Sequence, residues 1–171
     1  YHNDERVIIN QTALGEERGG YLKLNQTLKS ATSTFNSYKT DSPYVRHKVK
    51  VHGVSEPSEL IAKSIDIKID TLDDYIERNN LTTIDLLKID VEGFEESVIS
   101  GAKRSIASGL YKLIEIELTL DDRFGKRQNF FNLEKVLVPN GYTICAFNDK
   151  YSILEKPIFN LDVLYVHQSL L

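Results

Sequence analysis

The sequence predicts an α/β fold, with a mostly parallel sheet that carries helices on both of its faces. From residue 71 to the end, predicted helices and strands alternate, which is the order of βαβ units. The stretch 84–89 (IDLLKI) shows little polar–apolar alternation, as expected for a strand covered on both faces. The chain has 171 residues and is 41% hydrophobic. These values suit a single domain over residues 1–171 with a sizeable core.

The first part of the chain is expected to contain four strands and one long loop. Residues 7–14 (VIINQTAL) are rich in β-branched side chains, and residues 21–25 and 65–69 alternate strictly. Residues 45–54 (VRHKVKVHGV) also alternate, with basic side chains on one side, which favours a half-exposed strand. The polar stretch 27–42 reads as a loop.

The second part begins with a short helix that Thr71 can cap, with Asp74 completing a near capping box. A helix is predicted over residues 92–108, because apolar residues recur there every four positions and Glu95 and Glu96 suit its first turn. The last strand follows without a helical signal, so an antiparallel edge is expected. The remaining elements are a strand at 113–118, a helix at 132–138, and strands at 142–147 and 161–166.

Composition excludes several classes of function. The formal net charge of −4 gives no electrostatic case for nucleic acid or an anionic membrane, and no apolar run is long enough to span a bilayer. Cys145 is the only cysteine, which excludes an internal disulfide and fits a cytoplasmic protein. His2, His47, His52 and His167 show no metal-ligand spacing.

Charged residues gather where two predicted strands run side by side. Lys88 and Asp90 share one face of their strand, and Glu115 and Glu117 share one face of the next. If the strands are neighbours, Lys88 can meet Glu115 or Glu117. Lys88 is then either a structural ion-pair partner or a residue of a binding site.

Asp90 and Glu92 stand past the end of the strand, where ligands bind in open parallel sheets. The simple structural interpretation makes Asp90 a helix cap and Glu92 a solvated acid. Gly93 allows unusual dihedrals or a close backbone approach at the same turn.

The stretch 85–102 (DLLKIDVEGFEESVISGA) closely resembles the signature of the FkbM-type S-adenosylmethionine-dependent methyltransferases. Other segments resemble that family in the same order: 8–16 (IINQTALGE), 30–35 (SATSTF), 70–76 (DTLDDYI) and 114–118 (IEIEL). The resemblance extends to about Val166.

The resemblance implies a Rossmann-like methyltransferase sheet, mostly parallel with an antiparallel strand near its edge. It implies transfer of a methyl group from S-adenosylmethionine to a hydroxyl of a sugar or secondary metabolite. The family's first strands and glycine-rich cofactor loop have no counterpart here, and the chain lacks methionine even at position 1. The chain is therefore expected to be the C-terminal part of a methyltransferase domain.

The resemblance also assigns roles to individual residues. Asp90 and Glu92 are the expected catalytic residues; Thr12, Ala13 and Leu14 are expected to line the cofactor, and Glu117, Lys88 and Ser33 to contact the acceptor. The acids Asp90, Glu92 and Glu117 could instead hold magnesium, but the chemistry does not require it, and no metal is assigned.

Two alternatives stay open at this point. One is a catalytically inactive methyltransferase-like module for binding or assembly, and the other is an unrelated nucleotide-binding protein, which the signature disfavours. The partner of the active form would be a small-molecule or glycan acceptor. If the first strands are absent, a sheet edge is exposed, so pairing with a second copy is expected.

Overall fold

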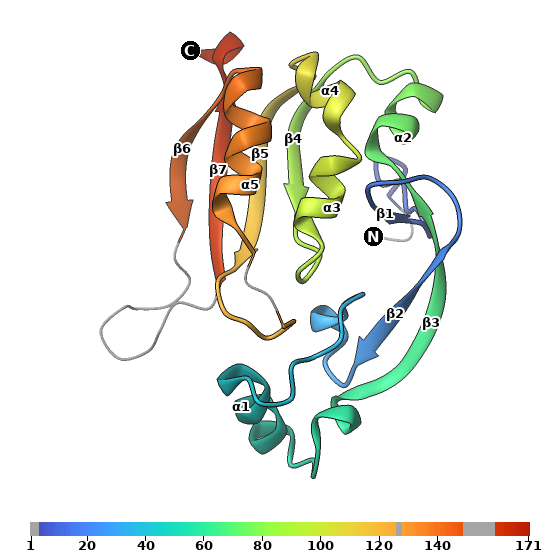
Figure 1. The fold of residues 1–171 in the computed structure, drawn as a ribbon. Helices are drawn as coiled ribbons and strands as arrows, with labels where there is room; N and C mark the ends of the chain where they lie inside the picture. Colours follow the sequence, from blue (N-terminus) through green and yellow to red (C-terminus); the bar gives the residue numbers. More distant parts are fainter. Residues whose placement is uncertain (1–3, 126–127, 149–159) are drawn as a thin grey trace.

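The computed structural model describes residues 4–125, 128–148 and 160–171, and its strands form two sheets (Figure 1). One sheet has the strand order β1-β3-β2 and the other has the order β4-β5-β7-β6. The strands are β1 (Ala13–Leu14), β2 (Tyr21–Thr27), β3 (Ile61–Asp70), β4 (Ile84–Ile89), β5 (Tyr111–Thr119), β6 (Tyr142–Asn148) and β7 (Asn160–His167). The helices are α1 (Pro43–His52), α2 (Leu72–Arg78), α3 (Glu95–Ser100), α4 (Lys103–Ala107) and α5 (Phe130–Leu137), with 3₁₀ turns η1 (Ser30–Thr32), η2 (Pro57–Leu60), η3 (Val138–Asn140) and η4 (Gln168–Leu170).

The expectation of one mostly parallel, Rossmann-like sheet is wrong. Among the described residues, only β1–β3 and β4–β5 pair in parallel. The pairs β2–β3, β5–β7 and β6–β7 are antiparallel. Both sheets are therefore mixed. In one, β2 and β3 run antiparallel, and in the other, β7 runs antiparallel to both of its neighbours, β5 and β6. The antiparallel pairing of the last two strands was expected and is confirmed.

The four-stranded sheet carries the main hydrophobic core. Leu87 lies beside Ile114 and Ile89 beside Ile116 in the β4–β5 register. Residues on this face pack with apolar side chains of α3, α4 and α5, which Figure 1 shows on the same side of the sheet. The opposite face is not covered in the same way, since the Lys88 side chain there remains 42% exposed. The expectation of helices on both faces therefore fails for this sheet.

The three-stranded sheet is thinner and more exposed. Leu22 pairs with Ile67 and Leu24 with Ile65, which puts four apolar residues on one face of the β2–β3 pair. Leu22 and Ile65 nevertheless remain exposed. This sheet therefore contributes little to the core.

Two strand expectations in the first part are corrected. Residues 45–54 are not a strand but belong to helix α1, which starts with Pro43 in its first turn and ends at Gly53 in the left-handed conformation. Of residues 7–14, only Ala13–Leu14 form a strand. Val7, Ile8 and Ile9 are exposed and pair with no strand among the described residues, so they lack the hydrogen-bonded neighbour that a strand needs.

The helix expected over residues 92–108 is two short helices, α3 and α4, separated at Gly101. The first of them, α3, starts only at Glu95, because Glu92 and Gly93 both have positive φ. The strands expected near 21–25, 65–69, 84–89, 113–118, 142–147 and 161–166, and the helices near 71–78 and 132–138, are confirmed with small shifts of their ends.

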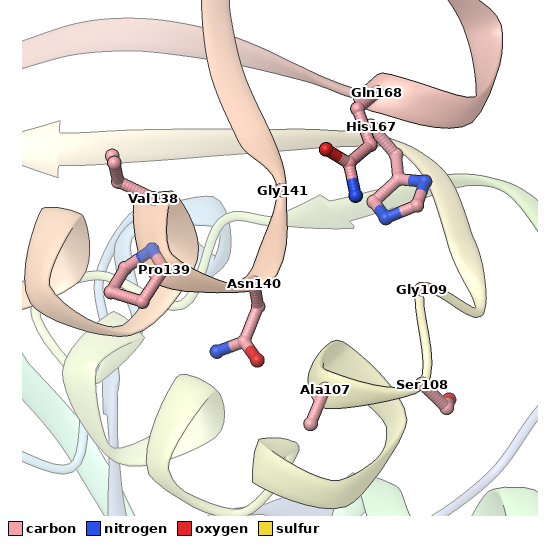
Figure 2. Close-up of a pocket in the computed structure, with 9 residues that line it drawn as sticks. All are labelled: Ala107, Ser108, Gly109, Val138, Pro139, Asn140, Gly141, His167 and Gln168. Carbon is pink, nitrogen blue, oxygen red and sulfur yellow. The ribbon is translucent and has the colours of Figure 1, made fainter.

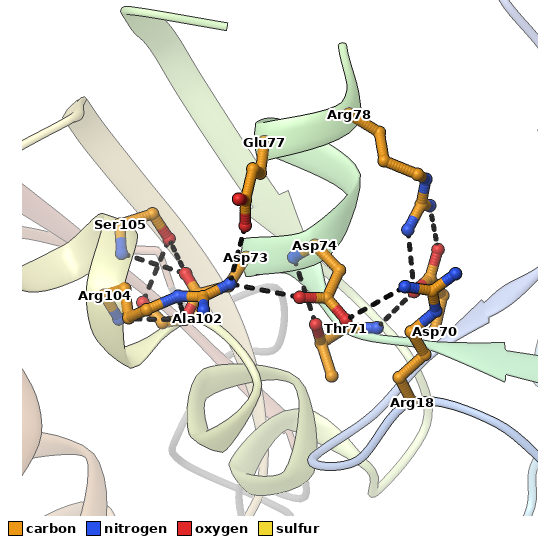
Figure 3. A network of polar contacts seen from close by, with 10 residues as sticks. All are labelled: Arg18, Asp70, Thr71, Asp73, Asp74, Glu77, Arg78, Ala102, Arg104 and Ser105. Atoms are coloured by element: carbon orange, nitrogen blue, oxygen red, sulfur yellow. Dashed lines mark hydrogen bonds and ion pairs between the residues drawn. The ribbon is translucent and has the colours of Figure 1, made fainter. Parts of the chain in front are cut away.

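The segment 70–78 has a structural role that Figure 3 displays. The Thr71 hydroxyl accepts from the Asp74 amide at 3.1 Å and so caps α2, as expected. The Asp73 carboxylate accepts from the amides of Arg104 (2.8 Å) and Ser105 (2.9 Å) at the start of α4. One short motif thus fixes two helix N-termini, which locks α2 against α4.

The outer edge of β1, within the first expected strand, is open in the described ranges, where β1 pairs with β3 alone. An open edge offers backbone groups to another strand. Pairing of this chain with a second copy stays a prediction.

Candidate functional site

The turn between β4 and α3 holds two successive residues at positive φ. Glu92 has φ 51° and Gly93 has φ 96°. A non-glycine residue in this region is uncommon and persists only where its surroundings hold it. The Thr34 hydroxyl donates to the Glu92 carbonyl at 2.7 Å, and the Asn36 amide donates to the Gly93 carbonyl at 3.1 Å.

Glu95 supports the same turn from the other side. Its Oε1 atom accepts from the amides of Val91 and Gly93, both at 3.1 Å, and its other oxygen accepts from Gln128. Only 1% of Glu95 is exposed, and burial raises the pKa of its carboxyl to about 7. Glu95 was expected only in the first turn of a helix, whereas its carboxylate fixes the backbone of the turn that contains Glu92.

The Glu92 carboxyl lies half-buried in a strongly charged environment. Burial raises its pKa above the ordinary value, and the negative charges of Glu117 and Asp90 act in the same direction. The positive charges of Arg123 and Lys48 oppose that rise. A carboxyl group whose pKa is raised takes up a proton more readily than an ordinary glutamate, which suits a general base.

Arg123 is a site residue that the sequence analysis missed. Its side chain is 1% exposed, yet it pairs with Asp121 at 2.8 Å and donates to Asn160 at 2.7 Å. Its guanidinium lies 3.6 Å from the centre of the Tyr44 ring, a close cation–π contact. The signal available in the sequence was the charged stretch 121–123, directly after the acidic strand.

Aromatic side chains also gather around this turn. Phe35 packs on Phe94 with ring centres 5.3 Å apart, and Tyr38 stacks on Phe124 at 5.7 Å. A Cβ atom on Gly93 would lie 2.5 Å from the Phe124 ring, so glycine is required there by contact as well as by φ. The loop 34–38, the turn after β4 and the segment after β5 therefore converge.

The expected catalytic and acceptor residues fall into three groups. Asp90, Glu92 and Glu117 act on one another electrostatically, so the structure brings them together. Lys88 Nζ lies 2.7 Å from Glu115, 3.8 Å from Asp90 and 3.9 Å from Asp162, so the expected ion pair with Glu115 is present, and a role of Lys88 toward the acceptor stays a prediction. Ser33 is half-buried beside Thr34, and it is Thr34 that contacts the Glu92 backbone.

The expected cofactor residues belong to the other sheet. Ala13 and Leu14 form β1 and pair with Ile69 and Asp70, while Thr12 is exposed just before them. The chain after β1 returns to the site region, because the Glu16 amide donates to the Ser97 hydroxyl of α3 at 3.1 Å. Both the end of β1 and the Glu92 turn thus adjoin α3.

A pocket of about 430 Å³ lies at the end of the four-stranded sheet opposite to the Glu92 turn (Figure 2). It is lined by the turn before β5, the turn before β6 and the end of β7, including Gly109, Asn140, His167 and Gln168. None of the expected site residues lines it. Within the described ranges no cluster of three or more side chains of the metal-binding types occurs.

Comparison with protein families decides the assignment. The family model described as "Methyltransferase FkbM domain" matches residues 2–144. The chain belongs to the FkbM methyltransferase family. The match covers β1 to β5 and the whole Glu92 turn, while β7, with Asn160 and Asp162, lies beyond it.

No curated protein and no solved structure matches this FkbM-family chain. In the described part of the chain, no helix has both the length and the apolar character that crossing a membrane requires.

Proposed function

We propose that this FkbM-family chain belongs to an S-adenosylmethionine-dependent O-methyltransferase that acts on a hydroxyl of a sugar or secondary metabolite. The observation that carries the proposal is the Glu92 carboxyl, which is half-buried, raised in pKa and held in a left-handed backbone conformation by Thr34 and Asn36. Strained, over-determined residues of this kind concentrate at functional sites.

The residues present suit the implied cofactor in their chemistry. Asp90, Glu92 and Glu117 gather carboxylates at one end of β4 and β5, and carboxylates favour a sulfonium cation. Thr12, Ala13 and Leu14 would line its adenine side. S-adenosylmethionine, when bound, supplies an activated methyl group whose carbon–sulfur bond breaks as the acceptor oxygen bonds to carbon.

The chain's own residues would then orient the acceptor and remove its proton. Glu92 accepts the hydroxyl proton, since its pKa lies closer to neutrality than that of an ordinary glutamate. Arg123 and Asp90 shift the pKa of Glu92 in opposite directions, Arg123 downward and Asp90 upward. Ser33 and Lys88 would contact the acceptor as secondary groups.

Calorimetry with S-adenosylmethionine and S-adenosylhomocysteine tests the cofactor. Asp90→Asn should weaken binding of the cationic S-adenosylmethionine by about tenfold and leave S-adenosylhomocysteine nearly unchanged, because only the former carries a charge. Asp85→Asn, an exposed acid on the same strand, is the matched control. Equal losses for both ligands, or no loss, would contradict the proposed electrostatic role.

Turnover with a panel of hydroxylated acceptors tests the base. Glu92→Gln should lower the rate by about 100-fold or more, since the proton acceptor is lost. The wild-type rate should rise with pH as Glu92 ionises, and its midpoint should lie above the ordinary glutamate value. An unchanged rate in the variant would remove Glu92 from the mechanism.

One observation favours the second candidate, an inactive methyltransferase-like binding module. The proposed cofactor residues stand in a different sheet from the acids. For that candidate, neither cofactor form should bind in the calorimetric experiment.

A further inference from the structure

The pocket of about 430 Å³ at the start of β5 is built from polar but uncharged side chains (Figure 2). Its volume lies in the range of about 300–1,000 Å³ that is typical of small-molecule sites. The described residues that line it include no Asp, Glu, Lys or Arg. Its polar side-chain groups come from Ser108, Asn140, His167 and Gln168, and it is called the His167 pocket below.

The His167 ring is held so that one of its nitrogens can donate into the pocket. The Ser169 backbone amide donates to Nδ1 at 3.2 Å, so a neutral imidazole carries its proton on Nε2. Nε2 faces Gly109, because a Cβ atom on this glycine would lie 2.8 Å from it. Tyr142 supports the imidazole, with the two ring centres 4.9 Å apart. No group of the described ranges accepts a hydrogen bond from Nε2, so this donor is available to a ligand.

Two side-chain amides border the same space. The Gln168 amide lies against Gly141, since a Cβ atom there would be 2.7 Å from its Nε2 atom. Asn140 donates through Nδ2 to the Val136 carbonyl at 2.7 Å, which leaves its Oδ1 atom as an acceptor. Figure 2 shows this oxygen turned toward the end of α4, across the pocket from the Gln168 amide. The pocket therefore presents donors at the end of β7 and an acceptor before β6.

The chemistry of the lining selects the class of ligand. A phosphate or an ammonium group needs a charged partner, and no charged residue of the described chain lines the pocket. The last residues of α4 and η3, Ala107 and Asn140, border it, and the partial negative charge of helix C-termini disfavours anions further. An apolar ligand would leave the imidazole and amide groups without partners. A neutral ligand with several hydroxyl groups satisfies them, because each hydroxyl both donates and accepts.

We propose that the His167 pocket binds an uncharged sugar unit, at a site separate from the Glu92 turn. His167 Nε2 and the Gln168 amide nitrogen donate to sugar oxygens, and Asn140 Oδ1 accepts from a sugar hydroxyl. A sugar ring holds its hydroxyl groups in fixed directions, which lowers the entropy lost on binding. This inference goes beyond the proposed function, because it assigns a second site that needs neither cofactor nor turnover.

Nuclear magnetic resonance of the histidine side chains tests the pocket directly. The chain has four histidines, so the imidazole signals are few, and His47 and His52 in α1 serve as internal controls. The chain is titrated at about pH 8, at which free imidazole is neutral, with glucose, galactose and N-acetylglucosamine, and separately with inorganic phosphate. At least one sugar should shift the His167 signals to saturation without moving those of His47 and His52. Phosphate should leave His167 unchanged.

Sorbitol controls for a general effect of hydroxylated solutes. It carries hydroxyl groups on an open chain whose rotatable bonds must be fixed on binding, so it should give a clearly weaker response than the sugar that binds. Equal responses to sorbitol and to the sugars would mean that the pocket does not recognise a sugar ring.

Matched variants make the result specific. Gln168→Ala removes a donor from an exposed side chain and should weaken sugar binding, followed by the His167 signals, by about fivefold. Gln11→Ala removes the same group from an exposed residue outside the pocket and should have no effect. His167→Phe keeps a ring beside Tyr142 but lacks the Nε2 donor, and it should weaken binding to a similar extent, followed by the Gln168 side-chain amide signals.

The proposal is overturned if none of the sugars shifts the His167 signals, if phosphate shifts them as strongly, or if Gln168→Ala binds as the wild type does. None of these measurements involves S-adenosylmethionine. Cofactor binding without a sugar response would overturn the His167 pocket alone, and a sugar response without cofactor binding would overturn methyl transfer alone.

Discussion

The two sheets of this FkbM-family chain differ sharply in how much apolar surface they bury. The core cluster is drawn almost entirely from the four-stranded sheet and the helices on it, including Ile114 and Ile116 of β5 and Val163 and Tyr165 of β7. The three-stranded sheet leaves Leu22 and Ile65 exposed. Buried apolar area is the main source of stability, so most of the stability is expected in the four-stranded sheet. This sheet with its helices is called the framework below, and the three-stranded sheet with the segment between β2 and β3 is called the attachment.

The candidate site lies on the border of these two regions. Its acids stand at the end of β4 and β5, where the framework fixes them. Thr34, Asn36 and Tyr44 come from the segment between β2 and β3, which belongs to the attachment. Functional residues often lie on loops that a rigid scaffold positions, and the two regions follow that division.

The largest expected effect tests where the stability resides. Ile116→Ala removes a fully buried side chain from the centre of β5 and should destabilise the chain by about 3–4 kcal/mol. Ile65→Ala removes the same atoms from a position that is 39% exposed, so it should cost less than about 1 kcal/mol. Urea unfolding of both variants measures the difference. Similar costs would mean that the three-stranded sheet is covered in solution.

A second prediction concerns pH and the Glu92 turn of the framework. The pKa of Glu95 is raised to about 7 by burial, so between about pH 4.5 and 7 the folded chain holds a proton that the unfolded chain releases. Stability should therefore fall as pH rises through this range, by up to about 3 kcal/mol. Glu95→Gln keeps the oxygen that accepts from Val91 and Gly93 but cannot ionise, and should flatten this dependence.

Urea midpoints at about pH 5 and 7.5 measure that slope. Glu96→Gln is the control, since it removes the neighbouring carboxylate from the same helical turn without touching the turn backbone. A slope that persists in Glu95→Gln and disappears in Glu96→Gln would show that Glu96 causes the pH dependence, which contradicts the prediction.

The sequence predicted most of the framework because its signals are local. The apolar run of β4, the Thr71 cap and the four-residue repeat in Val98 and Ala102 each depend on neighbours in the chain. The helix α1 was misassigned because Val45, His47, Val49 and Val51 fit a two-residue period as well as Val45 and Val49 fit a helical one. Pro43 before this segment and Gly53 after it were the stronger signals.

The contacts between the regions could not be predicted in the same way. The placement of β3 in a separate sheet depends on strand pairing across long sequence separations. Asp90, Glu92 and Glu117 were found because strand ends converge, but Arg123 and Thr34 reach the site from loops. The expected Ser33 lies one residue from Thr34, a distance that no sequence pattern resolves.

The smallest expected effect separates the two regions most directly. Gly101 ends α3 with φ −82°, which any residue adopts, but a Cβ atom there would lie 2.0 Å from the Gly15 carbonyl oxygen. Gly101→Ala should therefore push the chain after β1 away from α3 and cost about 2 kcal/mol. Gly53→Ala is the control, because it introduces a residue at positive φ with open space around it. Hydrogen exchange should accelerate in β1 and β3 of Gly101→Ala while amides of β5 and β7 stay protected. Equal acceleration in all four strands would show that the framework and the attachment unfold as one cooperative unit, and that their unequal burial does not translate into unequal stability.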